Sequence, residues 1–282
     1  MKIIHTISEL NILLNEARDN HKTIGFVPTM GALHQGHTSL VERSLQENEF
    51  TIVSIFVNPT QFNNPKDLEN YPRTLEDDCQ LLKHIGTNIV FAPSVHEMYP
   101  EKDERIFSYP PIDTVMEGAK RPGHFNGVCQ IVSKLFDIVK PDVAYFGEKD
   151  FQQIAVINAM VKDLNLKLQI KPCPIVREQT GLAMSSRNTL LTEEERLTAA
   201  NIYKQLSESV IYSKNHTIPE TIDFVTNALN NIEILNVEYF QIVDAETLQE
   251  INNWNDAKHI VGCITVFCGS MPVRLIDNIR YK

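Results

Sequence analysis

The sequence lacks any apolar run long enough to cross a membrane, and it is poor in positive charge. A membrane-spanning helix needs about 20 consecutive apolar residues, and no stretch of the 282 residues approaches that length. Lysine and arginine number 26 against 36 aspartates and glutamates, a net charge of -10. Because nucleic-acid binding requires a basic surface, we expect a soluble protein with neither a membrane nor a nucleic acid as partner. A small anionic substrate stays compatible, since a few cations in a cleft dominate locally.

The sequence also lacks a CxxC pair and a secretory cleavage site. Its five cysteines are odd in number and lie mostly in apolar surroundings, which favours reduced thiols and a cytoplasmic location. The first 20 residues carry early polar and acidic side chains without a small-residue cleavage site. This pattern argues against a signal peptide and predicts a strand, a turn and a helix instead.

Strand-like and helix-like segments alternate through the first two-thirds of the chain. The expected strands are 24–27, 51–57, 89–91, 143–146 and 168–170, and the expected helices begin near 36, 74, 127 and 151. Such alternation predicts an α/β fold, a Rossmann-like doubly wound parallel sheet. In that architecture ligands bind at the carboxyl ends of strands.

The pattern changes after about residue 175. Thr192 followed by Glu195 is a capping box that opens a long amphipathic helix to about Ser213, and a second helix is expected over 219–230. Strands are expected over 237–243, 260–267 and 272–276. The sequence therefore predicts two domains, residues 1–175 and a smaller α+β domain over residues 176–282.

The segment TIGFVPTMGALHQGHTSL, residues 23–40, has the strongest pattern in the chain. Its first strand is expected to end at Pro28, which cannot donate to a ladder, and a helix follows Gly36. His34 and His37 are three residues apart, so they share a face near the helix N-terminus. Free backbone N–H groups and the helix dipole make such an end an anion site. A lone HxGH also occurs by chance, as a surface or packing feature.

Other polar segments follow strand ends or precede helices. Gln61 in NPTQF is either a turn residue in solvent or a neutral group that orients a substrate. Arg121 in RPGHFNGV is suited to an anion, and Asn126 in the same segment is a candidate helix cap. Lys149 in GEKD is a point charge for phosphates. The MSSRN segment is either a linker or a phosphate-binding loop with two hydroxyls and a guanidinium.

Taken together, PTMGALHQGH, FVNPTQF, YPRT, RPGHFNGV, GEKDFQQ, MSSRN and PVRLIDN, in this order, resemble the pantothenate synthetases, or pantoate:beta-alanine ligases. This family belongs to the HIGH-type nucleotidylyl transferases. The resemblance implies ATP-dependent joining of (R)-pantoate and beta-alanine through a pantoyl adenylate, with release of pyrophosphate and AMP. It also implies a homodimer.

The resemblance assigns roles residue by residue. The residues implied to contact ATP are Met30, Gly31, Ala32, Leu33, His34, Gln35, Gly36, His37, Gly147, Glu148, Lys149, Asp150, Val176, Met184, Ser185, Ser186 and Arg187. Among these, the catalytic group is His34, His37, Lys149, Ser185, Ser186 and Arg187. The residues implied to bind pantoate and beta-alanine are Asn58, Gln61, Arg121 and Gln153. The resemblance also implies that Asp77 or Asp78 binds Mg²⁺. The structural alternative is that Thr74 caps a helix and that Asp77 lies in its first turn.

The sequence departs from the family pattern at Thr38, Gln130 and Thr189, none of which is an implied ligand. Three other functions remain open. A related HxGH nucleotidylyl transferase would leave AMP or CMP on its product, and a nucleotide sensor would bind ATP without turnover. Zinc binding by the two histidines and a cysteine is disfavoured, because no cysteine follows at ligand spacing.

Overall fold

The computed structural model describes all 282 residues, which form two compact units. The first unit contains Met1–Tyr109, Arg121–Glu148 and Gln153–Pro174, and the second contains Pro110–Lys120, Lys149–Gln152 and Ile175–Lys282. The predicted division after residue 175 lies one residue from the last change of unit. The two short inserted segments have no counterpart in the predicted division, because nothing in their local periodicity marks them.

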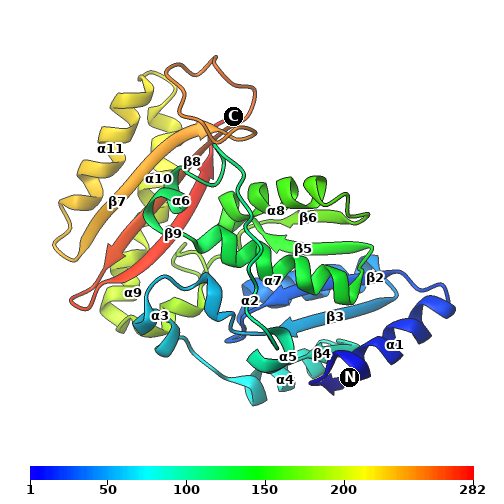
Figure 1. Cartoon of the computed structure of the whole chain (residues 1–282). Coiled ribbons are helices and arrows are strands. Elements are labelled where there is room, and N and C mark those ends of the chain that lie inside the picture. The colour runs from blue at the N-terminus through cyan, green and yellow to red at the C-terminus, as the bar shows by residue number, and fades with distance from the viewer. The chain divides into compact units, whose positions relative to one another are not determined.

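The first unit is built on a six-stranded parallel sheet in the order β1-β4-β3-β2-β5-β6 (Figure 1). Its strands are β1 (Lys2–Ile4), β2 (Ile24–Thr29), β3 (Phe50–Ile55), β4 (Ile89–Phe91), β5 (Val143–Gly147) and β6 (Gln169–Cys173). The strand order reverses direction between β2 and β5, which are adjacent. This topology confirms the predicted fold class and places its switch point where ligands bind in such sheets.

Helices cover both faces of this sheet. The helices of this part of the chain are α1 (Ile7–Asp19), α2 (Gln35–Glu47), α3 (Pro65–Glu69), α4 (Leu75–His84), α5 (Val95–Met98), α7 (His124–Val139) and α8 (Phe151–Asp163), with 3-10 turns η1 (Pro59–Gln61) and η2 (Glu148–Asp150). The segment Lys149–Gln152, which contains most of η2 and the start of α8, belongs to the second unit. Val27 of β2 packs in a core with Val41 of α2 and Leu82 of α4. The ring centroids of its neighbour Phe26 and of Phe136 in α7 are 6.3 Å apart. Successive residues of one strand therefore face opposite layers, as a doubly wound sheet requires.

Two local expectations were wrong. Strand β2 continues through Pro28 to Thr29, pairing with β3 to its end, while its pairing with β5 stops at Phe26. The missing proline N–H therefore removes no bond on the β5 side. Asn126 does not cap α7, which begins at His124 after Gly123. Its side-chain oxygen instead accepts from the Phe107 amide at 2.8 Å.

The second unit contains an antiparallel sheet in the order β7-β8-β9. Its strands are β7 (Leu235–Asp244), β8 (Ile260–Cys268) and β9 (Val273–Arg280), and its helices are α6 (Met116–Lys120), η3 (Ser186–Leu190), α9 (Glu193–Ala199), α10 (Asn201–Tyr212) and α11 (Ile218–Asn230). The capping box of Thr192 and Glu195 is present. The single long helix expected after it is instead two helices, separated at Ala200. Leu206 and Val225 pack with Ile264 in the core between helices and sheet.

The segment Pro110–Lys120 completes this second unit through Glu117, which is 8% exposed. Its carboxylate accepts two hydrogen bonds from the Arg274 guanidinium at 2.6 and 2.7 Å. The hydroxyls of Tyr239 and Thr265 donate to it at 2.8 and 3.0 Å. Burying a charge costs free energy unless hydrogen bonds and an opposite charge compensate it, and Glu117 has both. None of the helices is both long and apolar enough to cross a membrane.

Candidate active site

His34 and His37 lie together at the N-terminus of α2. His34 is the N-cap residue, and its Nδ1 accepts a hydrogen bond from the Gly36 amide at 3.1 Å. Nδ1 of His37 accepts from the His34 amide at 3.3 Å. The two ring centroids are 4.0 Å apart. The two histidines therefore lie at the helix start, and each ring also makes a capping hydrogen bond that the sequence spacing does not predict.

This capping fixes the tautomer of each neutral ring. A nitrogen that accepts from an amide carries no proton, so the proton of the neutral imidazole is on Nε2. Both histidines are therefore Nε2–H donors at the positive end of a 13-residue helix. Such donors are suited to a phosphoryl oxygen.

The backbone amides before α2 have a different role from the one that the sequence suggested. The Gly31 amide donates to the Thr29 hydroxyl at 3.2 Å, and the next two amides donate to the Asp78 carboxylate. Several of the N–H groups expected to be free at the start of α2 also have acceptors within the protein: the amides of His34 and Gly36 donate to imidazoles, and the His37 amide donates to the His34 carbonyl.

Asp78 is the buried carboxylate of this region, with 3% of its surface exposed. Burial raises its pKa, and the hydrogen bonds from the amides of Leu33 and Ala32 oppose that rise. The Thr74 hydroxyl donates to Asp78 at 3.2 Å and makes no capping bond to the α4 backbone. Thr74 thus precedes α4 as expected, but its side chain holds a carboxylate.

The acidic residues of α4 do not form a metal site by themselves. Asp77 is exposed, and both oxygens of Asp78 accept amide hydrogen bonds. No group of three or more histidine, cysteine, aspartate or glutamate side chains in the structure is arranged to hold a metal ion. Because Mg²⁺ requires near-octahedral oxygen ligands, this donor set does not fit a site built from protein alone.

Gln61 is held rigidly just after β3. It is 8% exposed, and its Oε1 accepts from the Asn58 side chain at 3.1 Å, while its Nε2 donates to the Met30 sulfur at 3.1 Å. Asn58 is only 1% exposed and also donates to the Gly127 carbonyl and accepts from the Tyr99 hydroxyl. The alternative of a turn glutamine in solvent is therefore wrong. Asn58 is buried and donates a hydrogen bond to the Gln61 side chain, so it is not a polar group at the surface.

The RPGHFNGV segment fixes the backbone that carries Gln61. A Cβ atom on Gly127 of α7 would lie 2.3 Å from the Thr60 carbonyl oxygen, so only glycine permits this approach. The His124 ring lies 2.9 Å from the Gln61 carbonyl oxygen through Nδ1. Nη1 of Arg121 lies 3.1 Å from Nε2 of the same ring. The segment thus joins Arg121 to the Gln61 turn inside the first unit.

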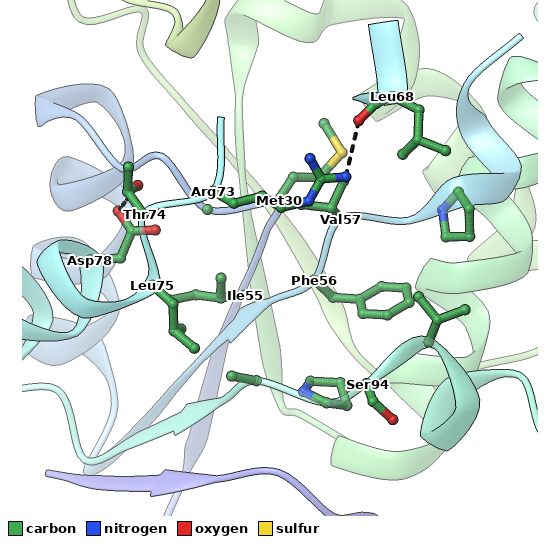
Figure 2. A pocket seen from close by; sticks show the side chains of 15 residues that line it. Met30, Ile55, Phe56, Val57, Leu68, Arg73, Thr74, Leu75, Asp78 and Ser94 are labelled. Carbon is green, nitrogen blue, oxygen red and sulfur yellow. Dashed lines mark hydrogen bonds between the residues drawn. The ribbon is translucent and has the colours of Figure 1, made fainter. Parts of the chain in front are cut away.

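A cavity of about 410 Å³ opens beside this turn, at the carboxyl ends of β2, β3 and β4 (Figure 2). Its walls are largely apolar and include Met30, Phe56 and Leu75, with Asp78 and Thr74 at one end. The Arg73 guanidinium at its edge donates to the carbonyl oxygens of Leu68, Glu69 and Tyr71. The cavity therefore suits a hydrocarbon group better than a polyphosphate.

The GEKD segment follows β5 and changes unit within itself. Gly147 and Glu148 belong to the first unit, whereas Lys149 and Asp150 belong to the second. The carbonyl oxygen of Lys149 accepts from the Asn278 side chain at 3.1 Å, and its Nζ lies 3.5 Å from Asp150. That separation makes a weak pair. The lysine backbone is thus fixed from strand β9 of the same unit.

The MSSRN segment is folded as a short hairpin with the residues before it. The Met184 amide donates to the Val176 carbonyl at 3.0 Å. Ser185 caps η3, its hydroxyl accepting from the Arg187 amide at 3.2 Å. The Asn188 side chain donates to Glu178 at 2.8 Å. These hydrogen bonds show that MSSRN forms a defined turn.

An ion pair that sequence reasoning did not assign holds this hairpin. Arg177 makes two hydrogen bonds to Asp277 of β9, at 2.6 and 2.9 Å, and its guanidinium lies 3.6 Å from the Tyr203 ring centroid. Burial raises the pKa of Asp277, and Arg177 opposes that rise. The terminal PVRLIDN motif contains Asp277, but nothing in that motif indicates that its partner lies 100 positions earlier in the chain.

The three departures from the family pattern each have a local hydrogen-bonding role. The hydroxyls of Thr38 and Thr189 donate to the carbonyls of Gln35 and Ser186 at 3.2 and 2.8 Å. The Gln130 amide donates to the carbonyls of Asp103 and Arg105. Each therefore satisfies its own polar atoms within the fold.

The candidate residues fall into two sets, one for each unit. The first unit holds Met30, Gly31, Ala32, Leu33, His34, Gln35, Gly36, His37, Asn58, Gln61, Asp77, Asp78, Arg121, Gly147, Glu148 and Gln153. The second unit holds Lys149, Asp150, Val176, Met184, Ser185, Ser186 and Arg187. In the first set, the amides of Ala32 and Leu33 donate hydrogen bonds to Asp78, and the Gln61 side chain donates one to the Met30 sulfur.

Comparison with known proteins gives one consistent result. Residues 2–280 match the family model described as pantoate-beta-alanine ligase. The chain is 60% identical to a pantothenate synthetase of Bacteroides fragilis, across 100% of this chain and 99% of that protein. It is 54% identical to a pantothenate synthetase of Porphyromonas gingivalis, across the whole of both.

Solved structures agree with these sequence matches. A pantothenate synthetase from Thermus thermophilus is similar with a TM-score of 0.92 and 40% identity, across 100% of this chain and 99% of that one. A pantoate-beta-alanine ligase from Francisella tularensis, complexed with beta-gamma ATP and beta-alanine, is similar with a TM-score of 0.85 and 38% identity. That comparison covers 100% of this chain and 98% of the other.

Proposed function

The chain belongs to the pantoate-beta-alanine ligase family, so it is a ligase that forms pantothenate, and we propose that it does so in two ATP-dependent steps. In the first step a carboxylate oxygen of (R)-pantoate attacks the α-phosphorus of ATP. The bond to pyrophosphate breaks and pantoyl adenylate forms. In the second step the beta-alanine amine attacks the acyl carbon, a proton leaves the nitrogen, and AMP departs. Adenylation is needed because a free carboxylate is a poor electrophile.

The single observation that carries this proposal is the pair of imidazoles at the start of α2. Both neutral rings carry their proton on Nε2, because both Nδ1 atoms accept a hydrogen bond from a backbone amide. Donors fixed before the reaction stabilise charge that develops on phosphoryl oxygens. His34 and His37 fill this role in the proposal, and His37 is also a candidate proton donor.

The remaining phosphate contacts come from cationic and hydroxyl groups. Lys149, Ser185, Ser186 and Arg187 bind phosphoryl oxygens in the proposal, with the guanidinium compensating charge on the departing pyrophosphate. The other proposed ATP contacts are Met30, Gly31, Ala32, Leu33, Gln35, Gly36, Gly147, Glu148, Asp150, Val176 and Met184. The fixed backbones of Lys149 and the MSSRN turn support this assignment, because they reduce the entropy lost on binding.

Pantoate and beta-alanine are assigned to the region around Gln61. Gln61 and Gln153 orient pantoate in the proposal, and Arg121 supplies a positive charge for an anionic group. A neutral amide suits the first task because it binds a hydroxyl or amine without neutralising the nucleophilic carboxylate. The burial of Gln61 supports a positioning role, since its side chain is already in one orientation. Asn58 contributes by holding that orientation.

Mg²⁺ enters the proposal as part of the nucleotide substrate. Mg²⁺ usually keeps several waters and takes substrate phosphates with one or two carboxylates. That mode requires no closed cage of protein ligands, in agreement with the donor set around α4. When bound, it neutralises phosphate charge.

Isotope exchange tests the first step directly. The protein is incubated with ATP, Mg²⁺, pantoate and labelled pyrophosphate, without beta-alanine. We expect label to enter ATP, since adenylation is reversible. No exchange in an active preparation would reject the adenylate. A related nucleotidylyl transferase would release pyrophosphate but no AMP with both substrates present, and a nucleotide sensor would bind ATP in calorimetry and form no product.

The proposal also includes a cellular location and an oligomeric state. The five cysteines are free and buried, which supports a reducing, cytoplasmic location. A homodimer is implied by the family resemblance, and sedimentation equilibrium of the purified chain tests it. A mass of 32.1 kDa in that experiment would be a monomer and would contradict the dimer.

A further inference from the structure

The Asp78 carboxylate lies against the loop that connects β2 to α2, here called the β2–α2 loop (Met30–His34). Its Oδ2 accepts from the Ala32 amide at 2.9 Å, and its Oδ1 accepts from the Leu33 amide at 2.8 Å. We propose that Asp78 is a positioning residue that fixes the β2–α2 loop and thereby His34 and His37, and that it is not a magnesium ligand. The inference rests on the proposed function only for its effect on turnover.

The loop has a conformation that needs an external partner. Gly31 has φ +81° and Ala32 has φ +50°, so two successive residues lie in the left-handed region. An L-residue rarely adopts this region without support. Successive backbone amides can form an anion-binding concavity, and in this loop the amides of Ala32 and Leu33 donate to one and the same group. Here the anion is a side chain of the protein, and its two oxygens match the two amides.

The contacts continue from Asp78 to the imidazoles. Leu33, whose amide Asp78 accepts, is directly followed by His34, the N-cap of α2. The His34 amide then donates to Nδ1 of His37. A shift of the loop would therefore move both rings and change the atoms that fix their tautomers. A misplacement of about 1 Å is enough to lower turnover by on the order of a hundredfold. The hydrogen bonds from Ala32 and Leu33 to Asp78, here called the clamp, therefore affect catalysis although Asp78 does not contact substrate.

Neighbouring residues are shaped around the same carboxylate. The Thr74 hydroxyl donates to Oδ1 at 3.2 Å, and Figure 2 shows this bond at one end of the cavity. A Cβ on Gly31 would lie 3.1 Å from Oδ2 and 3.1 Å from a methyl of Ile55. Carboxylate and loop are therefore packed in contact.

The metal role competes for the same oxygen atoms. Of the roughly four acceptor directions of a carboxylate, Oδ1 uses two for the Leu33 amide and the Thr74 hydroxyl, and Oδ2 uses one for the Ala32 amide, so little of Asp78 is left for a cation. Asp78 is 3% exposed, and it belongs to no group of three or more histidine, cysteine, aspartate or glutamate side chains arranged to hold a metal ion. The two roles thus predict different behaviour on substitution.

The test uses Asp78→Asn in the full-length protein, with Glu76→Gln as the matched control. Glu76 is an exposed carboxylate in the same first turn of α4. Asparagine keeps the shape but replaces one acceptor with a donor, which faces an amide. We expect hydrogen exchange at Ala32 and Leu33 to accelerate by about tenfold or more in the unliganded protein, because a lost hydrogen bond of about 1.4 kcal/mol is a factor of ten in the opening equilibrium. The β2 amides of Phe26 and Val27 should be unchanged, and Glu76→Gln should alter neither pair.

Kinetics then separate positioning from metal binding. For Asp78→Asn we expect kcat to fall by about tenfold or more, while the Mg²⁺ concentration for half-maximal rate stays unchanged. Unaltered exchange at Ala32 and Leu33 would overturn the proposal, and so would a kcat restored by saturating Mg²⁺. If the variant does not fold, Thr74→Val removes one donor to the carboxylate, and the same loop amides should still exchange faster than in wild type.

The two proposals fail separately. Wild-type protein that gives no pyrophosphate exchange would refute the adenylate mechanism. If Asp78→Asn still accelerates hydrogen exchange at Ala32 and Leu33 in that case, the clamp stands without the mechanism.

Discussion

The β2–α2 loop and the hairpin of residues 176–188 carry candidate phosphate-binding groups, but they are held in different ways. In the β2–α2 loop the imidazoles themselves accept backbone amides, and a buried carboxylate accepts two more. In the 176–188 hairpin the supporting contacts come from other side chains, mainly the pair of Arg177 and Asp277. Ser185 and Arg187 form a local cap.

The difference shows how chemistry and structure are shared among residues. In the first region the same side chain stabilises the helix start and is a proposed phosphate ligand, so its loss affects both roles. In the second region the supporting residues differ from the proposed ligands, so each role is open to separate substitution. Three substitutions, ordered by expected free-energy effect, test this distinction.

Asp277→Ala should have the largest effect. It leaves the Arg177 guanidinium partly buried without its carboxylate, and breaking a buried pair costs about 3–5 kcal/mol. Urea unfolding followed by circular dichroism measures the loss. The double variant Arg177→Met with Asp277→Leu should recover most of it, because apolar replacement removes both charges. A single variant within about 0.5 kcal/mol of wild type would show that the pair does not hold the hairpin.

His37→Ala should reduce kcat by on the order of a hundredfold or more, since a donor to the transition state is lost. The helix start should also loosen, because the His34 amide loses its acceptor. Steady-state kinetics of pantothenate formation measure the first effect. His84→Ala, which changes an exposed histidine in the last turn of α4, is the control and should retain wild-type kcat. Near-normal turnover of His37→Ala would remove this residue from the mechanism.

Gly31→Ala compared with Gly86→Ala isolates the smallest effect. Both glycines have left-handed φ values, +81° and +90°, so both substitutions cost about 1–2 kcal/mol in backbone strain. Only at Gly31 does the added methyl meet Asp78 and Ile55; the space around Gly86 is open. Thermal unfolding should therefore show a larger loss for Gly31→Ala. Equal losses would mean that the loop gives way beside Asp78 at no cost.

Periodicity predicted the sheet well because apolar runs determine which segments are buried. Residues 89–91 form a strand with the expected bounds, and helices begin within a few residues of the expected places. The failures concern local balance. Pro28 is tolerated because the neighbouring ladder has already ended, and the helix expected to run to Ser213 is divided at Ala200, where no glycine or proline signals a break.

The functional groups were visible in the sequence, whereas their supports were not. His34, Lys149 and Arg187 lie in the HQGH, GEKD and MSSRN segments, which the sequence alone singled out as candidate phosphate-binding segments. By contrast, the role of Asp78 depends on amides 45 and 46 positions away, and Asn58 receives a hydrogen bond from Tyr99, 41 positions on. Long-range hydrogen bonds between unremarkable residues leave no local pattern, so only the folded chain reveals them.

The insertion of Glu117 into the second unit has a consequence for dissecting the protein. A fragment beginning at Ile175 would contain Arg274, Tyr239 and Thr265 but not the carboxylate that they surround. Its sheet would then carry a guanidinium and two hydroxyls stripped of their common acceptor. Arg274 would keep its pair with Glu238, but cutting the chain after Pro174 deprives residues 175–282 of a buried carboxylate that belongs to their own unit.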